Sequence, residues 1–326
     1  MASTGETLRL ALAGDTMLGR KVARAIDEGR ELLAPEVVAA AAEADLFIAN
    51  LECCISDRGD PWPDPRKPFF FRAPPRAAEI LATIGVDCVT LANNHALDFG
   101  TDALLDTFEH LRAAGIARVG AGTDVSEARA ARVLAAKGVR LAVIGASDHP
   151  ADFAAASDRP GIAYADLRTD PSSGWLAAEI GEATRHADAV LVTPHWGPNM
   201  TARPTTPVRR AARALEDAGA TLVAGHSAHV PHGAHGRVLY DLGDFVDDYA
   251  VDEQLRNDLG LLFLVDLDPT AGPRRLEAVP LKLDFCHTRI ATGADADWIR
   301  RRFIDACADL GTTAVQEEER VVVRWR

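Results

Sequence analysis

The chain has 326 residues, of which 48% are hydrophobic, and it carries a formal net charge of -13. This composition can form a large hydrophobic core, and so acidic a chain is a poor partner for the phosphate backbone of nucleic acid. Its five cysteines have no regular spacing, and no segment has the pattern of a signal peptide or a membrane span. The sequence therefore predicts a cytoplasmic protein with no disulfide framework and no nucleic-acid or membrane partner.

Short apolar runs alternate with helical patterns over most of the chain. Each run is typical of a buried strand, and the segments rich in Ala, Leu, Glu and Arg between the runs have helical spacing. The predicted strands span residues 8–14, 46–50, 88–93, 140–146, 189–195 and 220–226. The predicted helices span residues 101–114, 125–136, 174–186 and 207–218. This alternation indicates sheets covered by helices.

The pattern changes after about residue 236. Apolar runs now follow one another through short links, and a helical segment at 294–308 separates the last two. The runs span residues 236–245, 259–268, 276–285 and 320–326. They predict a second, more antiparallel sheet that closes an α/β fold.

Two segments have the composition of long loops. Residues 53–76 contain six prolines and three consecutive phenylalanines, and residues 147–172 are rich in Pro, Ser and Asp. Loops of this length in a compact domain are usually functional. The aromatic stretch 61–71 can form an apolar wall for a peptide side chain, or it can pack on the core through its own phenylalanines.

Polar side chains collect where the predicted strands end. In open α/β sheets, ligand sites form beyond the carboxyl ends of the strands. Taken singly, Asp15 and Asp98 can be helix caps, and the asparagines beside His95 can form a turn. Taken together, these groups predict a metal-binding site at one edge. They are Asp15, Asn50, Glu52, Asn93, Asn94, His95, His149, His195, His226, His229 and Asp244.

The segment GHSAHVPHGAHG, residues 225–236, carries four histidines directly after a predicted strand. Imidazole is a common metal ligand, although a solvated histidine-rich loop is the alternative interpretation. The sequence assigns no role to His232 and His235, nor to His149 further upstream.

Six motifs in this order resemble the CapA family, which is named for a bacterial poly-γ-glutamate capsule protein: GDTMLG, NLE, NNHALDFG, HWG, GHSAHVPHG and LGDF. The resemblance covers about residues 8–266. It implies the calcineurin-like metallophosphatase fold, a two-sheet β-sandwich flanked by helices in an αββα arrangement. We expect the strands and helix of residues 267–326 to complete a single domain that spans residues 1–326.

The resemblance also implies metal ligands. Asp15 matches the metal aspartate of the family's first strand, and Asn94 matches its asparagine ligand. Asn50 and Glu52 stand in the place of the second acidic motif. With the histidines that match the later motifs, the predicted metal ligands are Asp15, Glu52, Asn94, His195 and His226.

The chain departs from the usual metallophosphatase motifs at three places. Met17 stands where an Asp-x-His motif has its histidine, Asn50 and Glu52 replace the bridging aspartate, and the last two histidines are three residues apart. These changes favour one divalent ion bound by carboxylate, amide and water oxygens. We expect Ca, Mg or Mn rather than a Zn or Fe pair, and no organic cofactor.

His95 matches the family's catalytic histidine, and Asp98 is the carboxylate expected to orient it. His226 or His229, with Asp15 or Asp244, would form a second acid–base pair in the same pocket. Two bases on opposite faces of an sp³ carbon can remove a proton from one side and return it to the other. The predicted catalytic residues are His95, Asp98, His229, Asp15 and Asp244.

The resulting hypothesis is a metal-supported peptide epimerase that inverts one Cα. Some CapA-like proteins belong to lasso-peptide pathways, where the implied reaction inverts the C-terminal residue. The expected peptide contacts are Trp62, Phe70 and Trp196. Two alternatives stay open: a metal-dependent hydrolase of a phosphoester or γ-glutamyl amide, and a non-catalytic peptide-binding module. The sequence specifies neither the peptide nor the oligomeric state.

Overall fold

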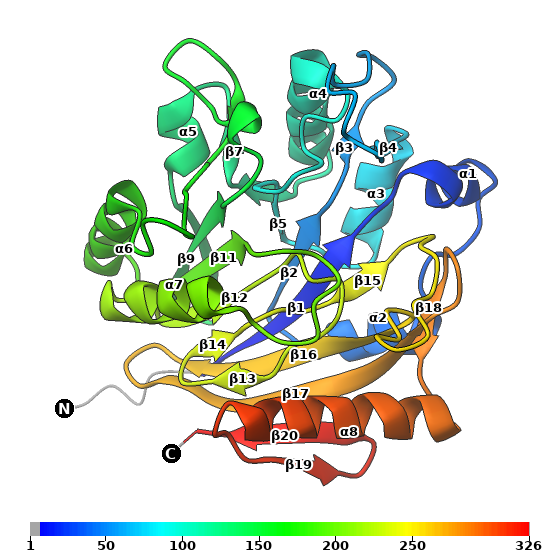
Figure 1. The fold of residues 1–326 in the computed structure, drawn as a ribbon, viewed down its shortest axis with the longest axis vertical. Coiled ribbons are helices and arrows are strands. Elements are labelled where there is room, and N and C mark those ends of the chain that lie inside the picture. Colours follow the sequence, from blue (N-terminus) through cyan, green and yellow to red (C-terminus); the bar gives the residue numbers. More distant parts are fainter. Residues whose placement is uncertain (1–6, 326) are drawn as a thin grey trace.

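The computed structural model describes residues 7–325, which form two large sheets packed face to face (Figure 1). Helices cover the outer face of each sheet. The predicted two-sheet sandwich flanked by helices is confirmed.

The first sheet contains ten strands among residues 7–325. Eight of them follow the order β19-β20-β17-β16-β1-β2-β5-β6, while β15 pairs with β1 and β18 pairs with β17. Their bounds are β1 Leu8–Thr16, β2 Leu46–Leu51, β5 Cys88–Thr90, β6 Ala117–Val119, β15 Asp244–Val246, β16 Leu259–Asp268, β17 Gly272–Leu283, β18 Thr288–Ile290, β19 Ala314–Glu317 and β20 Arg320–Arg324.

All strands from residue 244 onward join this first sheet, whereas residues 238–239 join the second, so the prediction that the C-terminal runs form a sheet of their own is wrong. Strand β16 pairs antiparallel with β1, from Leu8 opposite Leu267 to Leu12 opposite Phe263. Almost every residue of β16 is buried. A strand that is apolar on both faces needs neighbours on both sides, and β1 offers an edge for it.

The second sheet has the order β13-β14-β12-β11-β9-β8. Its central strands β9, β11, β12 and β14 are parallel. The bounds are β8 Arg132–Ala136, β9 Val139–Ser147, β11 Ala189–His195, β12 Leu222–Ala224, β13 Ala234–His235 and β14 Val238–Leu239.

The predicted helix at 125–136 is only half correct. Residues Val125–Arg129 form α5, but Arg132–Ala136 form β8, which pairs antiparallel with β9. Lys137 and Gly138 have φ angles of 48° and 73°, which suits a tight hairpin turn. Pairing with β9 therefore overrides the helical composition of this segment.

Helices cover both outer faces and one end of the sandwich. Helices α1 to α4 contribute to the core on the first sheet, and α6 and α7 pack on the second. Helix α8 packs against β16 and β17 at the bottom of Figure 1. Among residues 7–325, no helix is both long and apolar enough to span a bilayer. The remaining bounds are α1 Arg20–Asp27, α2 Pro35–Ala41, α3 Arg76–Thr83, α4 Gly100–Ala113, α6 Gly174–His186, α7 Thr206–Asp217 and α8 Gly293–Asp309.

Side-chain alternation along β1 separates the two cores. Leu10 and Leu12 point into the core between the sheets, while Ala11 and Ala13 point toward the helices. Burying each leucine contributes about 2 kcal/mol. Smaller elements lie in the connections: β3 Cys54–Ile55 with β4 Arg72–Ala73, β7 Ala121–Gly122 with β10 Gly161–Ile162, and a short 3₁₀ helix, Ala151–Phe153.

The strand register brings polar residues together at the carboxyl ends. Asp15 of β1 lies opposite Asn50 of β2 and also opposite Asp244 of β15. Strand β15 can approach β1 because each of the two segments has a glycine here. A Cβ on Gly14 would lie 1.7 Å from the carbonyl oxygen of Gly243, whose own φ angle is 72°.

Candidate metal and acid-base site

Strands of both sheets meet at one site with their carboxyl ends. Asp15 and Asn50 end strands of the first sheet, and the side chain of Asn50 donates to Asp15 Oδ1 at 2.7 Å. His195 ends β11 of the second sheet and forms an isolated parallel bridge with His226. His226 Nδ1 lies 3.5 Å from Asp15 Oδ1, which joins the two sheets at this point.

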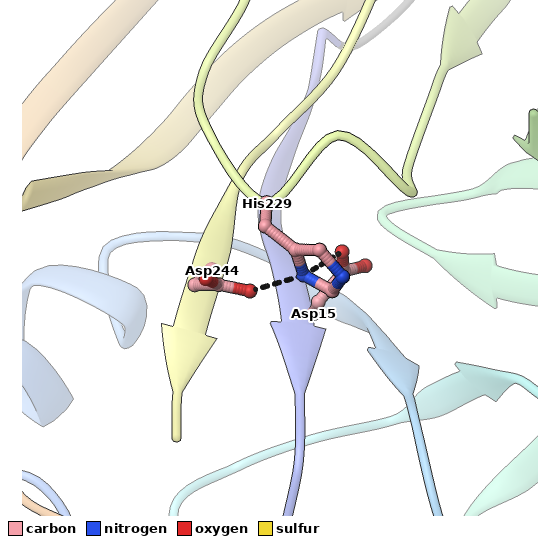
Figure 2. Close-up of side chains that lie close together, drawn as sticks. All are labelled: Asp15, His229 and Asp244. Atoms are coloured by element: carbon pink, nitrogen blue, oxygen red, sulfur yellow. Dashed lines mark hydrogen bonds and ion pairs between the residues drawn. The ribbon is translucent and has the colours of Figure 1, made fainter. Parts of the chain in front are cut away.

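His229 lies between two carboxylates of the first sheet (Figure 2). Its Nδ1 is 2.8 Å from Asp244 Oδ1 and 3.3 Å from Asp15 Oδ2. One ligand atom from each of these residues lies within 4.8 Å of the others. The backbone of His229 has a φ angle of 61°, and that of Ser227 has 110°. Such conformations are costly in non-glycine residues and concentrate at functional sites.

The predicted metal ligands all carry buried polar atoms without hydrogen-bond partners in the part of the chain that the structure describes. Unpaired buried oxygens and nitrogens of this kind are costly, unless a ligand or water completes them. Carboxylate, amide and imidazole atoms are suitable donors for a divalent ion. The residues therefore fit a metal. The atoms are Asp15 Oδ2, Glu52 Oε1 and Oε2, Asn94 Oδ1, His195 Nδ1 and His226 Nδ1.

The electrostatics of these groups fit the same role. Burial alone would raise the pKa of Asp15, but the nearby imidazoles of His226 and His229 hold that pKa well below its usual range. Burial and the nearby Asp15 carboxylate raise the pKa of Glu52 well above its usual range. Burial lowers the pKa of His195, so its imidazole is neutral and can coordinate a cation.

His95 and Asp98 form a buried pair beside this cluster. His95 Nδ1 lies 2.6 Å from Asp98 Oδ2, which also accepts the Phe71 backbone N–H at 2.6 Å. The Phe71 ring stacks on the imidazole with centroids 4.0 Å apart. His95 Nε2 lies 3.9 Å from Glu52 Oε1. Asp98 therefore fixes the ring so that Nε2 faces the cluster.

The two histidines predicted to be catalytic have opposite electrostatic surroundings. Burial lowers the pKa of His95 to about 4, with Asp98 opposing that shift. Burial also acts to lower the pKa of His229, but the carboxylates of Asp244 and Glu52 raise it well above its usual range.

The departures from the usual metal motifs have visible consequences. Asn50 donates to Asp15, and its Oδ1 accepts from Asn93 at 2.9 Å, so its amide links two strand ends. Met17 is fully buried in the core, where its sulfur accepts the Gly19 N–H at 3.1 Å. Neither residue supplies a charged ligand.

Two cavities adjoin the site. One of about 610 Å³ is lined by His149 and His195, among others, and one of about 460 Å³ is lined by His95, Phe69 and Phe71. Asn94, Asn199 and His229 line both cavities. A ligand in either cavity therefore reaches His229.

The predicted peptide contacts lie elsewhere. Trp196 is buried in the core of the second sheet and donates to the Tyr240 carbonyl at 2.9 Å. Trp62 packs on Phe153 with ring centroids 4.8 Å apart. Neither tryptophan, nor Phe70, lines either of the two cavities.

Phe69 and Phe71, together with Tyr249, give the smaller cavity its aromatic wall. The rings of Phe69 and Phe71 stack with centroids 6.4 Å apart, while Phe70 packs against Phe99. Alternate residues of an extended segment point to the same side, so Phe69 and Phe71 share a face that Phe70 does not.

Several predicted alternatives are not seen. The N-cap residue is Gly19 for α1 and Phe99 for α4, so neither Asp15 nor Asp98 caps a helix. His232 bonds the Thr201 carbonyl, and His235 lies 3.2 Å from the Thr312 hydroxyl, both away from the site.

The sequence named His149 at this edge without a role, and it did not name Lys67 or Tyr249. His149 pairs with Asp148, and its ring lies 5.2 Å from that of His195. Lys67 Nζ lies 2.8 Å from Asp98 Oδ1. Tyr249 lies 5.3 Å from the His229 ring. Lys67 belongs to an irregular loop, so only the folded chain shows what it contacts.

Comparison with known proteins places the chain in a family. Residues 9–249 match the family model described as "Bacterial capsule synthesis protein PGA_cap". The chain belongs to this capsule synthesis family. Within it, a Mycobacterium tuberculosis protein named as a polyglutamine synthesis accessory protein is 35% identical over 276 residues, which cover 78% of this chain and 70% of the relative.

The family also includes proteins named CapA. The Bacillus subtilis PGA biosynthesis protein CapA is 30% identical over 250 residues, which cover 74% of this chain and 64% of that protein. Among solved structures, a 5′-nucleotidase precursor from Thermus thermophilus overlaps with a TM-score of 0.45 and 14% identity, covering 94% of this chain and 59% of that one. A hypothetical protein from the same organism overlaps with a TM-score of 0.45 and 18% identity, covering 86% and 96% of the two chains.

Proposed function

We propose that this member of the capsule synthesis family is a metal-supported acid–base enzyme that inverts a Cα of a peptide residue. The observation that carries the proposal is that two histidine–carboxylate pairs face one cavity. His95 with Asp98 and His229 with Asp244 are joined at 2.6 and 2.8 Å, and both histidines line the cavity of about 460 Å³.

The residues that would hold a divalent ion are Asp15, Glu52, Asn94, His195 and His226, whose unpaired buried atoms are suitable ligands. A bound cation would stabilise negative charge that develops on a substrate carbonyl oxygen. The mixture of carboxylate and amide oxygens with two histidines suits Ca, Mg or Mn, each of which accepts oxygen ligands.

The two pairs can divide the proton transfers between them. Each imidazole uses Nδ1 to bond its carboxylate, which leaves Nε2 for the substrate. One neutral imidazole takes the Cα proton, and the electron pair of the C–H bond moves toward the adjacent carbonyl. The other imidazole, in its protonated form, then gives a proton to the opposite face of the planar carbon. The carboxylates fix each ring and stabilise its charged form.

The smaller cavity supports a peptide as the substrate. Phe69, Phe71 and Met200 give it apolar lining, and Arg20, Asn199 and Asn257 add polar groups at other points. A peptide combines side chains of both kinds with main-chain carbonyls, so it suits such a lining.

A second candidate is hydrolysis of a γ-glutamyl amide. The observation that favours it is that relatives are named for polyglutamate or polyglutamine synthesis. The same donor set could bind a water nucleophile, and His95 could protonate the leaving nitrogen.

Incubation of candidate peptides with the metal-loaded protein in heavy water separates the two reactions. Epimerisation puts deuterium at one Cα and leaves the peptide intact. Release of peptide fragments or glutamate without deuterium at Cα would reject the proposal. His235→Ala is the matched control because His235 belongs to the same histidine-rich segment but lies outside the site.

A further inference from the structure

Lys67 brings a positive charge to the His95–Asp98 pair. Its Nζ lies 2.8 Å from Asp98 Oδ1 and donates to the Asn94 carbonyl oxygen at 2.7 Å. The Lys67 side chain is only 13% exposed. Burying an ammonium group costs free energy, so its partners must compensate for the lost water.

The contact with Lys67 completes the surroundings of the Asp98 carboxylate. Asp98 Oδ2 already bonds the His95 ring and the Phe71 N–H. Lys67 lies at the other oxygen, Oδ1. With both oxygens engaged, the carboxylate cannot turn without losing a charged contact, and the imidazole bonded to it keeps one orientation.

The same ammonium group also reaches the proposed metal ligand Asn94. It bonds the main-chain oxygen of Asn94, while the side-chain Oδ1 of that residue has no partner among residues 7–325. Lys67 thus ties the acid–base pair to the backbone of a ligand residue. Lys67 also lines the smaller cavity.

The loop that carries Lys67 does not depend on this charge for its attachment. The backbone N–H groups of Trp62 and Phe71 both bond Asp98, at 2.8 and 2.6 Å. Phe71 is also buried in the core. These contacts hold the loop in place without the Lys67 ammonium group. The ion pair between Lys67 and Asp98 is therefore not needed to attach the loop.

We propose that Lys67 is a positioning residue that holds Asp98, and through it the His95 imidazole, in the orientation for proton transfer. This inference rests on the proposed function in taking His95 as an acid–base group. The ring orientation itself can be measured without turnover.

The first test follows the His95 Nδ1–H proton by NMR in Ca²⁺-saturated protein with ¹⁵N-labelled histidine. The resonance is assigned by its loss in His95→Gln. Lys67→Met keeps an unbranched side chain, one atom shorter, and removes the charge. We expect a sharp low-field resonance in the natural protein and its broadening or loss in Lys67→Met. An unchanged resonance in Lys67→Met would overturn the inference.

A second test restores the charge chemically. In Lys67→Cys, alkylation with bromoethylamine gives an ammonium side chain of nearly the natural length, and alkylation with iodopropane gives a neutral one. The five natural cysteines are all buried, which favours reaction at position 67. We expect the aminoethyl derivative, and not the propyl derivative, to show the His95 resonance. Equal spectra would refute a role for the charge, even if Lys67→Met does not fold.

Turnover gives the third readout. For a peptide that exchanges at Cα, Lys67→Met should lower kcat about 100-fold while KM changes less than about threefold, because positioning acts on the transition state. If the natural protein exchanges no Cα proton but the NMR results hold, the proposed function fails and the positioning role stands. If Lys67→Met exchanges the Cα proton as fast as the natural protein and keeps the His95 resonance, the positioning role is wrong and the proposed function stands.

Discussion

The side chain of Asn50 donates to Asp15 Oδ1 at 2.7 Å, in the place of the second acidic motif that the family resemblance implies. The amide contributes a donor there and no charge. Asp15 therefore shares its surroundings with two histidines, an amide and the Asp244 carboxylate, and Glu52 adds a further acidic group nearby.

Asn50→Asp tests the consequence of this pairing. A carboxylate at position 50 loses the bond to Asp15 and places two buried like charges together, which should lower the free energy of unfolding by about 2–4 kcal/mol in EDTA. A divalent ion should recover more stability in the variant than in the natural protein, because it gains an anionic ligand. Urea unfolding with and without Mn²⁺ measures both effects. The control is Asn199→Asp, at an exposed residue of the cavities. Mn²⁺ should stabilise this variant by as much as it stabilises the natural protein.

Glu52→Gln and His226→Ala should each reduce metal affinity about tenfold or more, since each removes a buried donor from the proposed ligand set. Elemental analysis after dialysis and Ca²⁺ titration calorimetry provide the measurement. His235→Ala should bind the ion as the natural protein does. Unaltered metal binding in both site variants would contradict the ligand assignment.

Phe69→Ala should weaken binding of a peptide substrate about threefold to tenfold, because Phe69 lines the cavity and 55% of its surface is exposed and free to be covered by a ligand. Phe70→Ala should leave KM unchanged, since Phe70 faces Phe99 instead. Steady-state kinetics on the two variants give the comparison. The reverse order of effects would restore the original prediction for Phe70.

Glu277 makes a pH-dependent contribution to stability. Burial raises the pKa of Glu277, but hydrogen bonds from Arg275 and Arg320 bring it down to about 2. Because the unfolded value is about 4.3, the unfolded chain binds a proton first as pH falls. The stabilisation is complete above about pH 5 and is lost toward about pH 2. Glu277→Gln should therefore cost about 1 kcal/mol near neutral pH and progressively less in acid. The urea midpoints of the natural protein and Glu277→Gln should converge as the pH falls across this range. A difference between them that does not change with pH would argue against the pairing of Glu277 with the two arginines.

The strand pattern of the sandwich could be predicted from the sequence because its central strands are continuous apolar runs, as in Leu8–Thr16 and Ala189–His195. Tertiary pairing could not be predicted. The segment at 132–136 has helix-forming composition but gains a strand neighbour in β9. The C-terminal run at 259–268 joins β1 because an edge was available to it.

The candidate site, too, could be predicted from the sequence only in part. The convergence of Asp15, His195 and His226 could be anticipated, because residues at the carboxyl ends of parallel strands meet at one edge. Contacts made by the irregular loop 53–76 could not. The position of Lys67 at Asp98, and the choice of Phe69 over Phe70 as cavity lining, depend on loop geometry that no periodicity encodes.

The central claim is that His95 and His229 serve opposite faces of one carbon. It is tested most directly by measuring Cα deuterium exchange of each peptide epimer separately in His95→Ala and His229→Ala, with both variants metal-loaded. If each histidine serves one face, each variant should lose inversion but still exchange the Cα proton of one epimer, and the two variants should retain opposite epimers. Loss of exchange for both epimers in one variant, with normal inversion in the other, would contradict the account.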